Sequence, residues 1–198
     1  MSVSTALIVT IIVVVVVVIV LLAIFFAVRR SRARRQEQQR ERTREEFGSE
    51  YERTAQEKGS EEEAEKELRR RRGSVERNVE PLPDERREHF EAQWGEVERV
   101  FVENPEKSIE MADRTVSDIL HERRFVTDPS QSDEETEKNL AVLHPDVADD
   151  YREARRMRAD VVARSGGSSG GDTGEQSTED LRQAIQRYRA VYGRLIER

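Results

Sequence analysis

Residues 6–28 read ALIVTIIVVVVVVIVLLAIFFAV and decide how the rest of the chain is organised. The stretch is 23 residues long, carries no charge and has one polar side chain, Thr10. At about 1.5 Å per residue a helix of this length extends roughly 35 Å, enough to span a hydrocarbon core of about 30 Å. Its β-branched residues would favour a strand in water, but a lone strand in lipid leaves its backbone groups unpaired. We therefore predict a transmembrane helix.

The orientation of this helix is predicted from the five arginines that follow it, Arg29, Arg30, Arg32, Arg34 and Arg35. Positive residues beside a span stay in the cytoplasm. Residues 1–5 are then expected outside the cell and everything after residue 28 inside, with the span in the inner (plasma) membrane. A cleavable signal peptide is the competing interpretation, but residues 1–5 lack the basic residues it needs. Ala23 and Ala27 form a small-xxx-small pair, which alone is a weak indication of helix pairing.

The composition limits the remaining possibilities. The net charge of −7 belongs wholly to the part after residue 28 and argues against nucleic acid as the main partner. The absence of cysteine excludes disulfides, thiol catalysis and cysteine-ligated metal. Apolar residues make up only about a quarter of the part after residue 28, which is lean for a globular domain. We therefore expect one solvated arm and one small core.

The arm is predicted over residues 29–80, which are dense in Arg and Glu. A helix is expected over about 31–58, with a disturbance at Gly48 and its end at Gly59. A second is expected over 61–72, opened by a capping box of Ser60 and Glu63 and ended by Gly73. Acid-first i, i+4 pairs such as Glu65–Arg69 and Glu67–Arg71 support the second helix.

A thin apolar stripe runs along this arm, and it has two interpretations. One is a coiled-coil spacer or partner surface; the other, which we favour, is a solvated helix that touches the bundle with a few side chains. The a/d pattern is not sustained over three heptads. The run Arg69–Arg72 could contact phosphate, but the glutamates before it favour a salt-bridged helix end. The stripe comprises Phe47, Tyr51, Ala55, Ala64 and Leu68.

A helical bundle is predicted over residues 81–198. Four amphipathic segments, at about 84–102, 105–124, 145–164 and 178–197, each keep apolar residues at a period of 3.6. Asn104 and Pro105 are expected to start the second. A short helix is allowed near Leu140, and residues 165–177 read as a flexible loop. No strand pattern is present, so the expected fold is all-α: a single transmembrane helix, a charged helical arm and a four-helix bundle-like domain.

The three histidines are the only candidates for metal or proton chemistry. Asp118 and His121 are spaced i, i+3, as in half of a carboxylate–histidine site, but helical geometry turns both away from the apolar stripe and towards water. His89 flanks its stripe, and His144 is expected at a helix start. Asp146, with Asp149 and Asp150, is interpreted as charge that complements the helix dipole. We assign no catalytic, cofactor-binding or metal-ligating residue.

Several phrases together resemble a family of uncharacterised bacterial proteins, common in actinobacteria, that are single-pass or labelled secreted. The resemblance covers roughly residues 40–195. It implies a bacterial membrane protein and brings no activity, cofactor or site residue with it. The phrases are Phe47–Tyr51 with Arg53, Glu67-Leu68 before the arginine run, Pro81-Leu82 with Glu85-Arg86, Trp94 ahead of Phe101-Val102, Ala112-Asp113, His144-Pro145 with Tyr151-Arg152, and Thr178–Arg182 with Tyr188-Arg189.

The leading functional hypothesis is a membrane-anchored interaction or scaffold module that binds another protein and is not an enzyme. Trp94, Tyr188 and Tyr192 are expected in the core rather than at a partner contact, because they lie on the apolar stripes. A ligand-sensing or enzymatic bundle is the alternative, motivated by tyrosines such as Tyr151 that point inward. A third possibility is an envelope-exposed protein of secreted type. The expected partners are the lipid bilayer and an unidentified protein.

Overall fold

The computed structural model describes residue 25 and residues 37–126, 128, 130–165 and 174–197. These residues are helical or irregular, and none of them lies in a strand, so the described part of the protein is all-α. The predicted membrane span apart from residue 25, the pair Ala23 and Ala27 and most of the 165–177 loop lie outside the described residues. Within the described ranges, no helix combines the length and apolar character that a membrane span requires.

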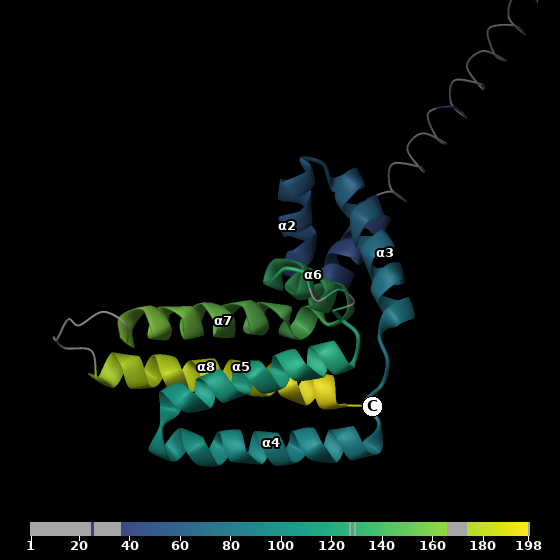
Figure 1. Cartoon of the computed structure of the whole chain (residues 1–198). Helices are drawn as coiled ribbons and strands as arrows, with labels where there is room; N and C mark the ends of the chain where they lie inside the picture. The colour runs from purple at the N-terminus through teal and green to yellow at the C-terminus, as the bar shows by residue number, and fades with distance from the viewer. Residues whose placement is uncertain (1–24, 26–36, 127, 129, 166–173, 198) are drawn as a thin grey trace, which may run out of the picture. The chain divides into compact units, whose positions relative to one another are not determined.

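The chain divides into two compact units, Met1–Glu45 and Glu46–Arg198. Of the first unit, residue 25 and residues 37–45 are described and are helical. The second unit contains all the helices labelled in Figure 1. They are α2 (Ser49–Lys58), α3 (Glu61–Asn78), α4 (Asp84–Glu103), α5 (Pro105–Glu122), α6 (Asp133–Leu143), α7 (Pro145–Ser165) and α8 (Gly174–Ile196).

The predicted bundle is formed by α4, α5, α7 and α8, which lie side by side (Figure 1). Helix α4 packs on α5, α5 on α8, and α8 on α7, so that α5 and α8 occupy the middle. The predicted apolar stripes meet between them: Val97, Val116, Ile119, Leu120 and Val191 are fully buried. The four predicted segments therefore form helices as expected, and so does the short helix around residue 140, which is α6.

The second half of the fold is a hairpin of α2 and α3 that reaches the bundle through α6 and α7. Gly59 ends α2 in a left-handed conformation, with φ of 74°, and the Ser60 side chain accepts a hydrogen bond from the Glu63 backbone N–H at 3.1 Å. Both features match the prediction. The break at Gly48 is also confirmed, since its φ is 53° and α2 begins at the next residue.

The prediction that Gly73 ends α3 is wrong. Helix α3 continues through Gly73 to Asn78. A glycine inside a helix costs only about 1 kcal/mol relative to alanine, and Val75, which is buried in the core cluster, lies in the extra turns. Burial of one apolar side chain is worth about 1.5–3 kcal/mol, so tertiary packing outweighs the local signal.

The apolar stripe of the arm does more than touch the bundle. Phe47, Tyr51 and Leu68 belong to the same buried cluster as the bundle residues, and Ala64 is fully buried. Because these few side chains are all enclosed, the hairpin is an integral part of the second unit rather than a solvated spacer. The lean apolar content of the arm is concentrated on one face.

Helix α5 ends in a tight reversal that positions the connection to α6. The Phe125 N–H donates to the Leu120 carbonyl at 2.9 Å, and the Arg124 N–H donates to the His121 carbonyl at 3.0 Å. This pair of bonds is the Schellman pattern, in which the left-handed residue is usually glycine. Here it is Arg124, with φ of 60°. A non-glycine residue in this region costs roughly 1–2 kcal/mol, so the arginine is held there by its surroundings.

Candidate functional site

The residues first considered for metal chemistry do not form a site. Asp118 and His121 are exposed on α5, as helical geometry predicted, and His89 is exposed on α4. All three line an open hollow of about 380 Å³ that also includes Phe90. Among the described residues, no three His, Asp or Glu side chains are grouped closely enough to hold a metal ion.

His144 lies between α6 and α7, where it caps α6 and precedes Pro145, the first residue of α7. Its ring lies 5.8 Å from that of Phe125. The pKa of His144 is lowered to about 4, mainly by burial and in smaller part by the positive charges of Arg194 and Arg123. Within the described part of the chain its Nδ1 atom is buried without a hydrogen-bond partner. His144 is therefore a neutral, half-buried side chain at neutral pH.

The acidic start of α7 is used in ion pairs. Asp149 accepts a hydrogen bond from Arg152 at 2.5 Å, and Asp150 accepts one from Arg187 of α8 at 2.7 Å. Asp146 lies 3.4 Å from the Arg194 guanidinium of α8. The Asp149 pair lies within α7, whereas Asp146 and Asp150 connect α7 to α8, which is a structural role beyond the dipole complement that the sequence suggested.

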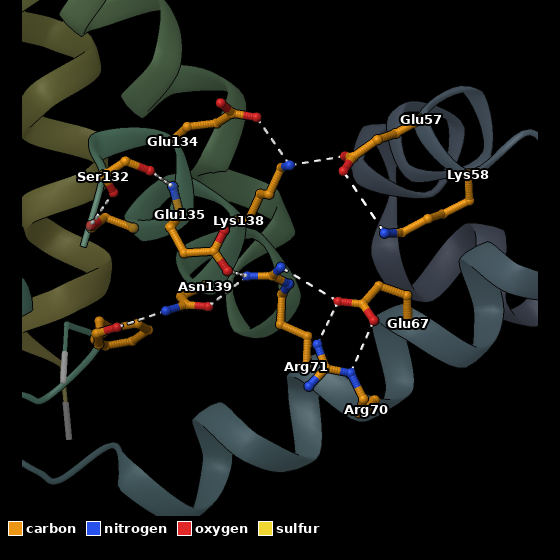
Figure 2. A network of polar contacts seen from close by, with 12 residues as sticks. Glu57, Lys58, Glu67, Arg70, Arg71, Ser132, Glu134, Glu135, Lys138 and Asn139 are labelled. Carbon is orange, nitrogen blue, oxygen red and sulfur yellow. Dashed lines mark hydrogen bonds and ion pairs between the residues drawn. The ribbon is translucent and has the colours of Figure 1, made fainter. Parts of the chain in front are cut away.

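A polar network joins the hairpin to α6 (Figure 2). Arg71 of α3 reaches across to α6, where it pairs with Glu135 and donates to the Asn139 side-chain oxygen at 3.1 Å. Lys138 of α6 reaches back to Glu57 of α2 at 2.9 Å. The Asn139 side-chain N–H group in turn donates to the Phe125 carbonyl at 2.9 Å. The network thus links α2, α3, α6 and the connection after α5.

The arginine run is salt-bridged, as predicted. Arg69 lies 3.6 Å from Glu65, and Arg70 binds Glu67 through two hydrogen bonds of 2.9 and 2.7 Å. Arg72 donates to Glu76 at 2.7 Å. The run lies inside α3 rather than at its end, so the dipole at a helix terminus does not explain it.

A second ionic cluster holds α2 to α7. Glu50 is a buried carboxylate, 3% exposed, that pairs with Arg152 of α7. Burial raises the pKa of Glu50, and Arg152 opposes this rise. Glu137 of α6, 3.9 Å from Arg152, has a pKa raised by burial and lowered in part by Arg155 and Arg152. These residues border a cavity of about 440 Å³ with a polar lining.

The tyrosines that motivated a ligand-sensing bundle are engaged inside the protein. The Tyr188 hydroxyl donates to Asp113 of α5 at 2.9 Å, and Arg158 of α7 donates to the other oxygen of Asp113 at 3.0 Å. Burial raises the pKa of Tyr151 to about 12. The Tyr192 ring stacks on Trp94 with centroids 4.4 Å apart. The prediction that Trp94, Tyr188 and Tyr192 belong to the core is confirmed, since all three are buried.

An apolar groove lies between α4 and α8. It has a volume of about 270 Å³ and is bordered by Trp94, Phe101 and Ile185. Glu98 and Arg189 form an ion pair of 2.6 Å at its edge, and Glu98 also accepts the Trp94 indole N–H at 2.8 Å. The groove therefore has an apolar floor and a charged rim.

Sequence reasoning missed the residues that assemble these polar sites. Arg71 and Glu135 are 64 positions apart, and Glu50 and Arg152 are 102 apart. In a chain with 34 basic and 41 acidic residues, the sequence offers no way to choose one pairing from the many that are possible. Tyr51 is the one indication in the sequence: an aromatic residue in an otherwise polar arm indicates a buried helix face, and Glu50 lies next to it.

Comparison with family models, with curated proteins and with solved structures gives no match. The resemblance to the actinobacterial family therefore stays a prediction from the quoted phrases.

Proposed function

We propose that the protein is a membrane-anchored helical module that binds another protein through the groove between α4 and α8. The groove is the observation that carries this proposal. An apolar floor bordered by Phe101 and Ile185 inside a charged rim that includes Arg189 resembles the energetic centre of a protein interface, where aromatic residues and arginine are enriched. Its volume of about 270 Å³ is below the roughly 300–1,000 Å³ of small-molecule pockets, and suits one large apolar side chain of a partner.

The position of the groove favours contact with a partner. Phe101 is half-buried at its border, and Val102, the next residue of α4, is 84% exposed. An exposed apolar side chain beside an apolar groove extends the surface that a partner helix would cover. The charged pair of Glu98 and Arg189 would fix the orientation of that helix more than its affinity.

A photo-crosslinking amino acid at Gln186, which borders the groove, tests this proposal in intact cells. We expect one defined crosslinked product. The Phe101→Ala exchange should remove it, because Phe101 borders the groove, whereas Glu110→Ala on the exposed side of α5 should preserve it. A product that is equally strong in both variants, or the same product with the crosslinker at Glu110, would contradict the proposal.

The anchor is the second part of the proposal. It is supported by the uncharged 23-residue stretch at 6–28 and the five arginines after it. By the positive-inside rule we expect residues 46–198 in the cytoplasm of a bacterial cell. Because the chain has no cysteine, a single Glu88→Cys exchange on the exposed face of α4 provides a unique label site. Labelling of intact cells by a membrane-impermeant maleimide would place the bundle in the envelope instead.

A further inference from the structure

A small cavity lies where α3 passes the connection between α5 and α6. Its volume is about 180 Å³, well below that of metabolite pockets. Arg70, Arg71 and Arg124 line it, and Glu135 is the one carboxylate among its described lining residues. The three guanidinium groups face one carboxylate within the cavity lining, while Glu67 and Glu80 pair with Arg70 and Arg124 from outside it.

Side chains that can donate hydrogen bonds line the α3 side of this cavity. Arg70, Ser74 and Asn78 are spaced i, i+4 and i+8, so they share one face of the helix. Arg71 contributes from the same turn as Arg70, and Figure 2 shows both side chains with Asn139 of α6 opposite. In the described part of the chain, Ser74 and Asn78 have no side-chain hydrogen bond. Their donors are therefore available to a ligand.

The opposite side of the cavity is formed by Arg124, the residue that occupies the left-handed position after α5. Glycine would fill this position without strain. An unfavourable backbone conformation at a residue that lines a cavity is typical of a functional site, where the surroundings hold a side chain in a fixed place.

The existing ion pairs do not prevent an anion from binding. Arg70 is paired with Glu67 and Arg124 with Glu80, but the two arginine side chains are 66% and 61% exposed. Ion pairs at such exposure contribute about 0–1 kcal/mol. A guanidinium group has five N–H donors in a planar fork that matches the oxygens of a phosphate group. We therefore expect a dianion that also reaches Ser74 and Asn78 to displace the carboxylates from Arg70 and Arg124. Arg71 is only 15% exposed and keeps its pairs with Glu67 and Glu135, so it contributes its charge from the wall of the cavity.

From these observations we propose that the cavity between α3 and the α5–α6 connection binds a phosphate group, held by Arg70, Arg71 and Arg124. Ser74 and Asn78 donate to the same group. The phosphate comes either from a lipid headgroup of the membrane or from a soluble phosphate compound, and the two sources offer the same chemistry to the site. This proposal does not depend on the protein-binding groove, which uses α4 and α8.

The test compares two neighbouring arginines of α3 in the full chain, reconstituted in phosphatidylcholine nanodiscs. Arg70 lines the cavity, whereas Arg69 does not, although both are exposed and paired with a glutamate of the same helix. Inorganic phosphate is titrated at constant ionic strength and the thermal midpoint is recorded. We expect a saturable rise in the unaltered chain and in Arg69→Gln. Arg70→Gln should weaken the apparent affinity by roughly tenfold or more, which is the value of one charged hydrogen bond.

The control with Arg69 also separates binding from the general effect of phosphate, which stabilises proteins by exclusion from their surfaces. That general effect would be equal in all variants. Ser74→Ala serves as a second variant that keeps the charge and is expected to weaken binding by a few-fold. An equal response of the unaltered chain, Arg69→Gln and Arg70→Gln, or the lack of any saturable response to either phosphate source, would overturn the proposal.

Nanodiscs that contain phosphatidic acid identify the source. If the phosphatidic acid raises the thermal midpoint without added phosphate, and Arg70→Gln abolishes the rise, the ligand is a lipid headgroup. If inorganic phosphate alone acts, the ligand is a soluble anion. Either result, with the selective loss in Arg70→Gln, supports the site.

Discussion

The bundle and the hairpin of the second unit are held by different forces. Between α4, α5 and α8 the contact is apolar, with Val97, Ile119 and Leu120 fully buried. Between the hairpin and α6 or α7, a smaller apolar contact is surrounded by ion pairs such as Arg71–Glu135 and Glu50–Arg152. Apolar burial is non-directional and is not screened by salt, whereas ion pairs weaken with salt and change with pH.

This difference shows which part of the unit can open by itself. Regions with few buried apolar contacts open at lower free energy than the core of a protein. We therefore expect the α2–α3 hairpin to open at lower free energy than the bundle.

The largest effect is expected from truncation of the bundle core. Phe90 of α4 is 1% exposed, and Phe90→Ala should lower the free energy of unfolding by about 4 kcal/mol through lost burial and the cavity left behind. Urea unfolding of the full chain in nanodiscs measures the loss, which should be the same at low and high salt. Val102→Ala, at an exposed site of the same helix, should change it by less than about 0.5 kcal/mol. Similar losses in both variants would contradict the assignment of the core.

The sequence predicted the bundle better than the hairpin for a physical reason. Each bundle helix carries its own apolar stripe, for example Leu181 to Leu195 of α8, and a stripe is a local pattern. The hairpin depends on pairings between distant residues, such as Arg152 with Glu50, that are not local. The exposed position of His121 was predictable from helical geometry, but the left-handed Arg124 was not, because a glycine is expected at such a position.

The second effect concerns the buried ion pair of the hairpin. Arg152→Met leaves Glu50 buried without its partner, and this should cost about 3 kcal/mol. Amide hydrogen exchange should show lost protection in α2 and α3 while α4, α5 and α8 keep theirs. Arg156→Met, at an exposed ion pair of the same helix, is the control. If the added exchange Glu50→Gln does not restore part of the loss, the pair is not the source of the effect.

The third effect is a pH dependence centred on His144. Its pKa of about 4 in the folded protein is below the usual value of 6.5, so the unfolded chain takes up a proton first as the pH falls. The contribution of the neutral His144 ring to the free energy of unfolding is fully present above pH 6.5. It falls by about 2–3 kcal/mol as the pH is lowered towards 4. Arg194 and Arg123 oppose protonation, whereas Asp146 and Glu197 favour it.

The difference in unfolding free energy between the unaltered chain and His144→Gln, measured from pH 7.5 to pH 4, isolates this contribution because the carboxyl groups titrate in both proteins. Glu50 and Glu137 act in the opposite direction, since their raised pKa values favour the folded state at low pH. His121→Gln, at an exposed histidine of α5, is the matched control. A parallel profile for His144→Gln and the unaltered chain would show that His144 is not the group responsible.

The smallest loss in the free energy of unfolding is expected when one polar contact inside the bundle is removed and the apolar packing around it is kept. Tyr188→Phe removes the hydroxyl that donates to Asp113 at 2.9 Å but keeps the ring in the core. Asp113 retains Arg158 at 3.0 Å and Arg155 at 3.7 Å, so no carboxylate is left without a partner. The expected loss is therefore that of one hydrogen bond to a charged group, about 1.5 kcal/mol.

Tyr192→Phe is the matched control for this exchange, because the Tyr192 ring stacks on Trp94 and, in the described part of the chain, its hydroxyl has no hydrogen-bond partner. That variant should differ from the unaltered chain by less than about 0.5 kcal/mol. Tyr188→Phe could instead lower the free energy of unfolding as much as Phe90→Ala does. In that case the contacts of Asp113 with α7 and α8 would stabilise the bundle as strongly as its apolar core. The contrast between an apolar bundle and an ionic hairpin would then have to be abandoned, because both regions would depend on buried charge.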